Sequence, residues 1–294
     1  MQNNKKGLTL SRKHNLIGWG FLLPATLLIV FMSFYPGIQG FLLSLQVGHG
    51  MQLTFGGLKN YVRILKDPVF KEVFFNTFFY LIIQVPIMLV LALILASMLN
   101  NKHLRCKAIF RTAIFLPCAT SLVSYSMIFR SLFTTDGLVN NIIRSFGMPS
   151  VNWFGNEWTA RGVIIIALIW RWTGYNMVFY LAGLQNIEYS VYEAAKIDGA
   201  SPAQSLFRIT IPLLKPTILL TAIMSTNGTL QLFDESVNLT SGGPGRATMT
   251  LSHYIYNTSF TNNPNFGYSA AMSFVIMVIV AILAFVQMKV GDKR

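Results

Sequence analysis

The chain has 294 residues, of which 53% are hydrophobic and only 11% are charged, and its net charge is +13. Several uncharged runs approach or exceed the roughly 20 residues that cross the hydrocarbon core of a bilayer, so the composition indicates an integral membrane protein and excludes a soluble enzyme of ordinary composition. The basic excess does not indicate nucleic-acid binding, because Lys and Arg concentrate at the cytoplasmic edges of membrane proteins.

An all-α protein with six membrane spans is expected. A polar tail at residues 1–14 precedes a single transmembrane domain at residues 15–294. Between the first two spans, residues 58–66 have a helical apolar period that predicts a short helix, either lying at the membrane interface or packed on the outer ends of the spans. The spans are predicted at residues 16–34, 73–99, 112–129, 162–184, 217–233 and 267–288.

The distribution of basic residues predicts the orientation of the chain. With both termini in the cytoplasm, most of the 23 Lys and Arg residues fall in inner segments. This bias agrees with the positive-inside rule. The same orientation places the polar segment 190–216, between the fourth and fifth spans, in the cytoplasm.

The first half of segment 190–216 has the signals of a short helix. Ser190, with Glu193 three residues later, matches the capping box that opens a helix. Gly199 suits the left-handed position that ends one. We therefore predict a helix that ends at a turn around Gly199.

The second half of this segment repeats the pattern. Ser201 and Gln204 match a second capping box. Pro212 and Pro216 are expected to stop the second helix and begin the next span. The segment is thus predicted to be a rigid helix–turn–helix just outside the membrane.

The same segment resembles the EAA loop of ABC-importer permeases, whose pattern is EAA, three residues, G, nine residues and I-x-L-P. The chain matches at every spacing and departs only in having Ile211 for leucine. In that family the loop docks into a groove on a cytoplasmic ATP-hydrolysing subunit. The resemblance implies a coupling role for Glu193, Ala194, Ala195, Asp198, Gly199, Ala200, Leu206, Phe207, Ile209 and Pro212.

Further strings extend the resemblance over most of the chain. They are GLKNYVRILKDPVF before the second span, NMVFYLAGLQNI in the fourth, TSGGPG in the last outer loop and FGYSAAMSFV in the last span. Together they resemble carbohydrate-importer permeases of the maltose, multiple-sugar and glycerol-phosphate type. The resemblance implies a type I ABC importer permease fold and a location in the bacterial cytoplasmic membrane.

The resemblance also implies partners. These are a second homologous permease, two copies of a subunit that binds ATP and Mg, and an extracytoplasmic solute-binding protein that delivers a sugar or oligosaccharide. This chain is then expected to bind no cofactor itself and to be no enzyme. In agreement, the sequence contains no phosphate-binding loop and no recognisable catalytic or metal-binding motif.

The fifth predicted span is unusually polar, and the fourth contains aromatic and amide side chains. Amides can hydrogen-bond the hydroxyl groups of sugars, and aromatic rings can pack on their C–H faces. The alternative is that such residues hold helices to one another or to the partner permease. The candidates for a substrate pathway are Trp172, Tyr175, Asn176, Asn227, Gln231 and Ser124.

Two further features bear on function. Arg171 lies near the middle of the fourth span, where a charge is costly, so it is expected to form a structural ion pair or to meet an anionic group on the substrate. The alternative function is an ion-coupled secondary carrier of a small polar solute. Such carriers commonly use carboxylates within their spans, and no Asp or Glu lies in the central part of any predicted span here.

Overall fold

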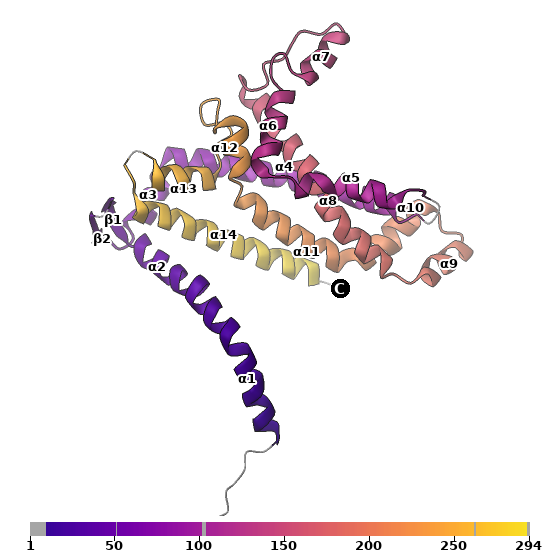
Figure 1. Ribbon diagram of the computed structural model, residues 1–294, viewed down its shortest axis with the longest axis horizontal. Helices are drawn as coiled ribbons and strands as arrows, with labels where there is room; N and C mark the ends of the chain where they lie inside the picture. The colour runs from indigo at the N-terminus through magenta and orange to yellow at the C-terminus, as the bar shows by residue number, and fades with distance from the viewer. Residues whose placement is uncertain (1–9, 51, 102–103, 262, 293–294) are drawn as a thin grey trace, which may run out of the picture.

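The computed structural model describes residues 10–50, 52–101, 104–261 and 263–292, and most of these residues are helical. Four long helices lie side by side along the longest axis of the molecule (Figure 1). They are α4 (Pro68–Leu99), α8 (Glu157–Gln185), α11 (Ile211–Leu230) and α14 (Phe266–Asp292). Helix α8 packs against both α4 and α11, so the three form the centre of the bundle.

Five helical segments are long and apolar enough to cross a membrane, and a bent pair of helices gives a sixth if the pair is one span. The five are Ile17–Ser44, Pro68–Leu99, Glu157–Gln185, Pro202–Leu230 and Phe266–Gly291. Each predicted span therefore overlaps helix, although the third is divided between two helices and the fifth runs past the end of its helix at Leu230.

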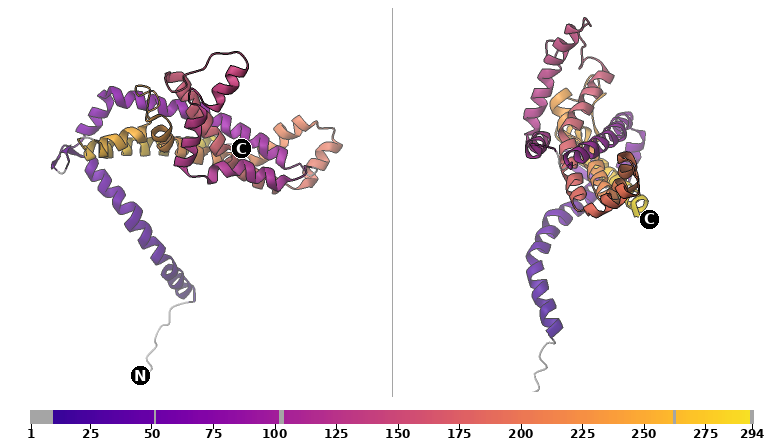
Figure 2. Two further views of the ribbon diagram at one scale, coloured as in Figure 1. Left: turned by 45° about the horizontal axis from the view of Figure 1, so that its top comes forward. Right: turned by 90° about the vertical axis from the view of Figure 1, so that its right-hand side faces the viewer.

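The first predicted span is part of a much longer rod that leaves the bundle (Figures 1 and 2). It consists of α1 (Leu10–Ile29), the π-turn η1 (Val30–Phe34) and α2 (Tyr35–Ser44). The side chains described from Ile17 to Gln39 are all exposed, and only α2 packs against α14. Residues 1–9 of the predicted tail lie outside the described residues.

Two prolines lie just after π-turns within continuous helical segments, although one of them, Pro212, was expected to end a helix. Pro36 and Pro212 each lie two residues after a π-turn, η1 or η2 (Leu206–Thr210), and the helix continues through both. In each π-turn the hydrogen bond reaches five residues back, from Tyr35 N–H to Val30 O in η1. The wider turn relieves the clash between a proline ring and the preceding turn. The expected stop at Pro212 and Pro216 is therefore wrong.

The predicted third span, 112–129, is not one helix. Helices α5 (Lys107–Ala119) and α6 (Leu122–Leu132) meet at an angle of 99°. Pro117 lies in the last turn of α5, where no π-turn precedes it, and Thr120 has an extended backbone. The hydroxyl and N–H groups of Thr120 both donate to the carbonyl of Pro117, which closes the end of α5.

The segment after α2 contains the only strands among the described residues. The strands β1 (Gln46–His49) and β2 (Gln52–Phe55) pair antiparallel, with Gln46 opposite Phe55. The predicted short helix is α3 (Lys59–Lys66). It packs on α14 and buries Ile64, while Val62 and Leu65 stay exposed on its other side. Helix α3 thus has both a packed face and an exposed apolar face.

One carboxylate joins three helices at this end of the bundle. Asp67 Oδ1 accepts a hydrogen bond from the N–H of Val69 and opens α4. Asp67 Oδ2 accepts from the hydroxyls of Tyr254 in α13 (Leu251–Phe260), at 2.7 Å, and Tyr268 in α14, at 2.6 Å. Burial alone would raise the pKa of Asp67, but these hydrogen bonds outweigh it and hold the pKa below its ordinary value of 3.8. The charged form is therefore the one that stabilises the fold.

Helices α5 and α8 approach each other most closely at Gly174. A Cβ atom there would lie 2.0 Å from the carbonyl oxygen of Ile114. By contrast, a Cβ atom at Gly162, in the same helix, would meet nothing within 4 Å. The contact between α5 and α8 therefore requires glycine at one of these positions only.

We expect Gly174→Ala to separate α5 from α8 and to cost at least about 1–3 kcal/mol of stability. Gly162→Ala is the matched control and should be neutral or stabilising by up to about 1 kcal/mol, because alanine favours helix. Thermal unfolding of the purified protein in detergent measures both. Equal melting temperatures for the two variants would contradict the close contact.

Candidate functional site

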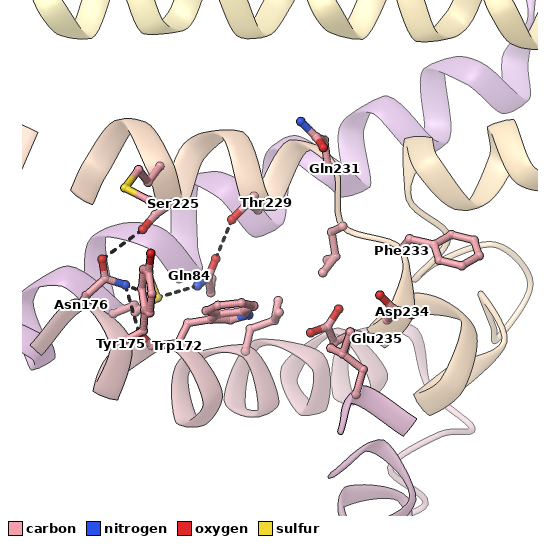
Figure 3. A pocket seen from close by; sticks show the side chains of 16 residues that line it. Gln84, Trp172, Tyr175, Asn176, Ser225, Thr229, Gln231, Phe233, Asp234 and Glu235 are labelled. Atoms are coloured by element: carbon pink, nitrogen blue, oxygen red, sulfur yellow. Dashed lines mark hydrogen bonds between the residues drawn. The ribbon is translucent and has the colours of Figure 1, made fainter. Parts of the chain in front are cut away.

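The structure contains a cavity of about 270 Å³ between α4, α6, α8 and α11 and the start of α12 (Asp234–Thr240) (Figure 3). Its wall combines aromatic rings, amides, hydroxyls and two carboxylates, set among apolar side chains. The lining residues are Gln84, Met88, Leu122, Leu168, Trp172, Tyr175, Asn176, Met224, Ser225, Gly228, Thr229, Gln231, Leu232, Phe233, Asp234 and Glu235.

Four of the six predicted pathway residues line this cavity: Trp172, Tyr175, Asn176 and Gln231. Asn227 instead lines two grooves between α11 and α14, and its side-chain oxygen accepts a hydrogen bond of 2.7 Å from Gln231. Asn227 and Gln231 are therefore neighbours in space, although Gln231 lies just past the end of α11.

Ser124 does not line the cavity. Helix α6 buries Tyr125, Ser126 and Phe129 against the bundle, and Ser124 lies on its exposed side. Only the first residue of α6, Leu122, reaches the cavity wall. The bend before α6 therefore removes Ser124 from the position that a straight third span would have given it.

Hydrogen bonds between neighbouring helices hold the amides of the cavity. The hydroxyl of Thr229 donates to Gln84 Oε1 at 3.1 Å, which joins α11 to α4. The hydroxyl of Ser225 donates to Asn176 Oδ1 at 3.4 Å, which joins α11 to α8. The sequence analysis did not identify Gln84, whose signal was a single amide in the long apolar run of the second span.

The carboxylate of Glu235 forms part of the opposite wall (Figure 3). Its side chain is only 3% exposed, and the hydroxyl of Tyr125 donates to its Oε1 at 2.7 Å. Burial raises the pKa of Glu235, against the lowering effects of the Tyr125 hydrogen bond and the nearby Arg171. Tyr125 thus connects α6 to the cavity.

Arg171 binds the backbone at the α5–α6 bend. Its guanidinium donates to the carbonyls of Thr120 at 3.0 Å, Pro117 at 3.3 Å and Cys118 at 3.5 Å, and it lies 4.6 Å from the ring centre of Tyr125. The end of α5 leaves these carbonyls without helical partners, and in a bilayer they need donors. Within this chain Arg171 therefore binds backbone carbonyls, a partner that the sequence analysis did not foresee, and the predicted acid or anionic substrate group stays a prediction.

We expect Arg171→Met to leave the carbonyls of Cys118 and Thr120 without their Arg171 donor and to cost about 2–4 kcal/mol of stability. Arg171→Lys should fall between this variant and the wild type, because an ammonium cannot reach three carbonyls as a planar guanidinium does. Arg130→Met, at an exposed position of α6, is the control and should unfold as the wild type does. Thermal unfolding in detergent distinguishes the variants, and a wild-type melting temperature for Arg171→Met would contradict the role of this residue.

The segment 190–216 forms one end of the bundle, away from the β-hairpin and α3 (Figure 1). Helix α9 (Tyr189–Ile197) leads to Gly199, whose φ is +78° as predicted. The N–H of Ala200 closes the turn by donating to the carbonyl of Ala195 at 2.9 Å. Helix α10 (Pro202–Ser205) follows. The hydroxyl of Tyr192 lies 3.0 Å from that of Thr210, which ties α9 to η2.

One of the two predicted capping boxes is present. Both hydrogen bonds of the box between Ser201 and Gln204 form. The box between Ser190 and Glu193 does not form, because the chain is already helical at Tyr189 and Ser190 lies inside α9. The Ser190 hydroxyl instead donates to Glu188 Oε2 at 3.3 Å. Glu193 therefore remains exposed and does not cap its own helix.

The predicted coupling residues differ in exposure. Ala195 was expected to contact a partner surface, but it is buried and packs within the segment. Ala200, Leu206 and Ile209 are half-buried. Ile197, which the sequence analysis did not single out, is 86% exposed. The exposed predicted residues are Glu193, Ala194, Asp198, Gly199, Phe207 and Pro212.

Comparisons with known proteins point in one direction. Residues 69–294 match the family model described as "Binding-protein-dependent transport system inner membrane component". The chain is 50% identical over 290 residues to the lactose transport system permease protein LacF of Rhizobium radiobacter, and the match covers 97% of each chain. It is 34% identical over 283 residues to the arabinooligosaccharides transport system permease protein AraP of Halalkalibacterium halodurans, with 95% of this chain and 89% of that protein covered.

The fold is also similar to a solved structure. A chain of a bacterial ABC transporter involved in the import of the acidic polysaccharide alginate superposes with a TM-score of 0.83 over 96% of both chains. The two sequences are 21% identical, so the likeness concerns the fold alone.

Proposed function

The chain belongs to the family of binding-protein-dependent transport system inner membrane components, and we propose that it is a permease subunit of an ATP-driven importer for a sugar or oligosaccharide. It is a transport component and no enzyme. The segment 190–216 carries the proposal: a rigid turn with the EAA pattern exposes Ile197 and Phe207 at one end of the bundle. Large apolar side chains exposed beside a polar segment are typical of a protein interface.

The substrate class is inferred from the cavity and the relatives together. Trp172 and Tyr175 offer ring faces, and the amides of Gln84, Asn176 and Gln231 offer hydrogen bonds, as sugar binding requires. The names of the relatives specify lactose and arabinooligosaccharides. A carbohydrate is the ligand that agrees with both.

The proposed assembly follows the family. Six spans, with the broken α5–α6 pair as the third, would place both termini and segment 190–216 in the cytoplasm of a bacterial cell. The unit 15–294 then forms one permease domain after a cytoplasmic tail at residues 1–14. A second permease would complete the pathway, two further subunits would bind ATP and Mg, and an extracytoplasmic binding protein would deliver the sugar.

A cycle follows from this arrangement. ATP binding would close the paired ATP-binding subunits, and the docked segment 190–216 would move with them. Because α10, η2 and α11 form one continuous helix from Pro202 to Leu230, this motion would reach Ser225 and Thr229 in the cavity wall. The cavity would thereby open alternately to the two sides of the membrane.

The source of energy separates this proposal from a secondary carrier. We expect proteoliposomes with the full assembly, the binding protein and enclosed ATP to accumulate radiolabelled lactose without an ion gradient. This chain alone should not accumulate it under a proton or sodium gradient. Gradient-driven uptake by the chain alone would favour the carrier and would sink the proposal.

The turn at Gly199 tests the coupling role. A Cβ atom at Gly199 would meet nothing within 4 Å, so substitutions act through the backbone conformation and the exposed surface only. We expect Gly199→Val, which is strained at this φ, to lower ATP-dependent uptake at least tenfold, and Gly199→Asn, which tolerates it, to keep most of the uptake. Gly199→Asp matches the asparagine variant except for its charge, and we expect it to abolish uptake at an apolar interface.

ATP-dependent uptake by the three variants is measured in the same reconstituted assembly. Each rate is divided by the amount of inserted protein. Val191→Ile, a conservative change in the exposed face of α9, serves as a control for substitution in the segment. Uptake by the valine and aspartate variants at the wild-type rate would show that this turn does not transmit force.

A further inference from the structure

The cavity contains acidic groups but no basic ones. Among its lining residues only Asp234 and Glu235 carry a charge, and none is Lys, Arg or His. Figure 3 shows their carboxylates on one side of Trp172 and the amides of Gln84 and Asn176 on the other. The ion pairs of the described residues, Arg144–Asp136 and Arg246–Glu72, involve neither carboxylate. The charged residues of the cavity lining are therefore all acidic.

The nearest cation is not available to a ligand. Arg171 is 5% exposed and donates to three backbone carbonyls at the α5–α6 bend. Its guanidinium lies over the rings of Tyr125 and Trp172, at 4.6 Å and 5.5 Å from their centres. To bind an anion in the cavity, this side chain would have to abandon the bend that it stabilises.

Glu235 is held in place for ligand binding. The hydroxyl of Tyr125 fixes one carboxylate oxygen at 2.7 Å, and Tyr125 itself is fully buried beneath Arg171. A fixed carboxylate is a strong acceptor for the hydroxyl of a sugar, because hydrogen bonds to charged acceptors are about twice as strong as neutral ones. In its charged form the same carboxylate, together with that of the adjacent Asp234, repels a ligand anion.

We propose that Asp234 and Glu235 make this cavity selective for uncharged sugars over uronates and other anionic sugars. This inference rests on the proposed function, because it assumes that the cavity binds a carbohydrate. At about 6 Å and an effective dielectric constant of about 20, one pair of like charges weakens binding roughly a hundredfold. An importer built on this wall thus differs in charge preference from the alginate transporter that shares its fold.

Ligand binding by the assembled complex tests the selectivity. The binding protein is left out, so that its own specificity does not enter. Saturation-transfer difference NMR compares lactose with digalacturonate, a disaccharide of similar size with two carboxylates. We expect the wild type to give a digalacturonate signal at least tenfold weaker than the lactose signal, and Trp172→Ala to abolish the lactose signal.

The two carboxylates are then neutralised without a change of shape. Asp234→Asn with Glu235→Gln keeps an acceptor for the Tyr125 hydroxyl and should raise the ratio of digalacturonate to lactose signal at least tenfold. Asp234→Asn alone should raise this signal ratio by a smaller factor. This single variant replaces the double variant in the test if the double variant is unstable. Asp136→Asn, an exposed acid far along the chain, is the matched control and should leave the ratio unchanged.

The outcomes separate the two proposals. Equal binding of both sugars by the wild type, or an unchanged ratio in the neutralised variants, would overturn the charge selectivity and leave the sugar permease standing. The absence of a lactose signal that depends on Trp172 would remove the carbohydrate from this cavity, and the selectivity would fall with it.

Discussion

A carbonyl group that loses its helical partner inside a bilayer must find another donor, and at the end of α5 the side chain of Arg171 supplies several such donors. Arg171 binds three carbonyls at the end of α5. Because these bonds stabilise the bend, α6 can leave the direction of α5 by 99°. The bend brings Tyr125 to Glu235 and thus sets one wall of the cavity. Fold and candidate site therefore depend on the same interaction.

Most prolines of the described helices do not end them. A π-turn precedes Pro36 and Pro212, and α1, α4 and α11 continue through Pro24, Pro86 and Pro216 without one. Only at Pro117 does the helix end within a few residues, and there a buried arginine adds to the hydrogen bonding of the freed carbonyls. In a π-turn the N–H group donates to the carbonyl five residues back instead of four. The residue types in these segments do not reveal this change. Sequence reasoning that treats each proline as a helix stop therefore errs at the continuous helices.

Patterns of short range predicted well, and contacts between distant segments did not. The left-handed Gly199 and the capping box at Ser201 follow from spacing within a few residues, and the structure confirms them. Five of the predicted apolar spans overlap long helices, whereas the third is broken. Gln84 and Glu235 join the cavity only through packing between helices far apart in the sequence. The partner of Arg171 was missed for another reason: sequence reasoning looks for an opposite charge, whereas this guanidinium binds backbone oxygen, which no residue type reveals.

One continuous helix has a mechanical consequence. From Phe207 to Thr229 it contains 22 steps, which span about 33 Å at 1.5 Å per residue. Phe207 and the cavity wall lie at two ends of a single helical lever, and tilting it about its middle by about 5° would shift each end by roughly 1.5 Å in opposite directions. Such a lever needs no relay of side chains between the two ends. The π-turn η2 interrupts its regular hydrogen bonding at the end near segment 190–216, where the proposed coupling would apply force.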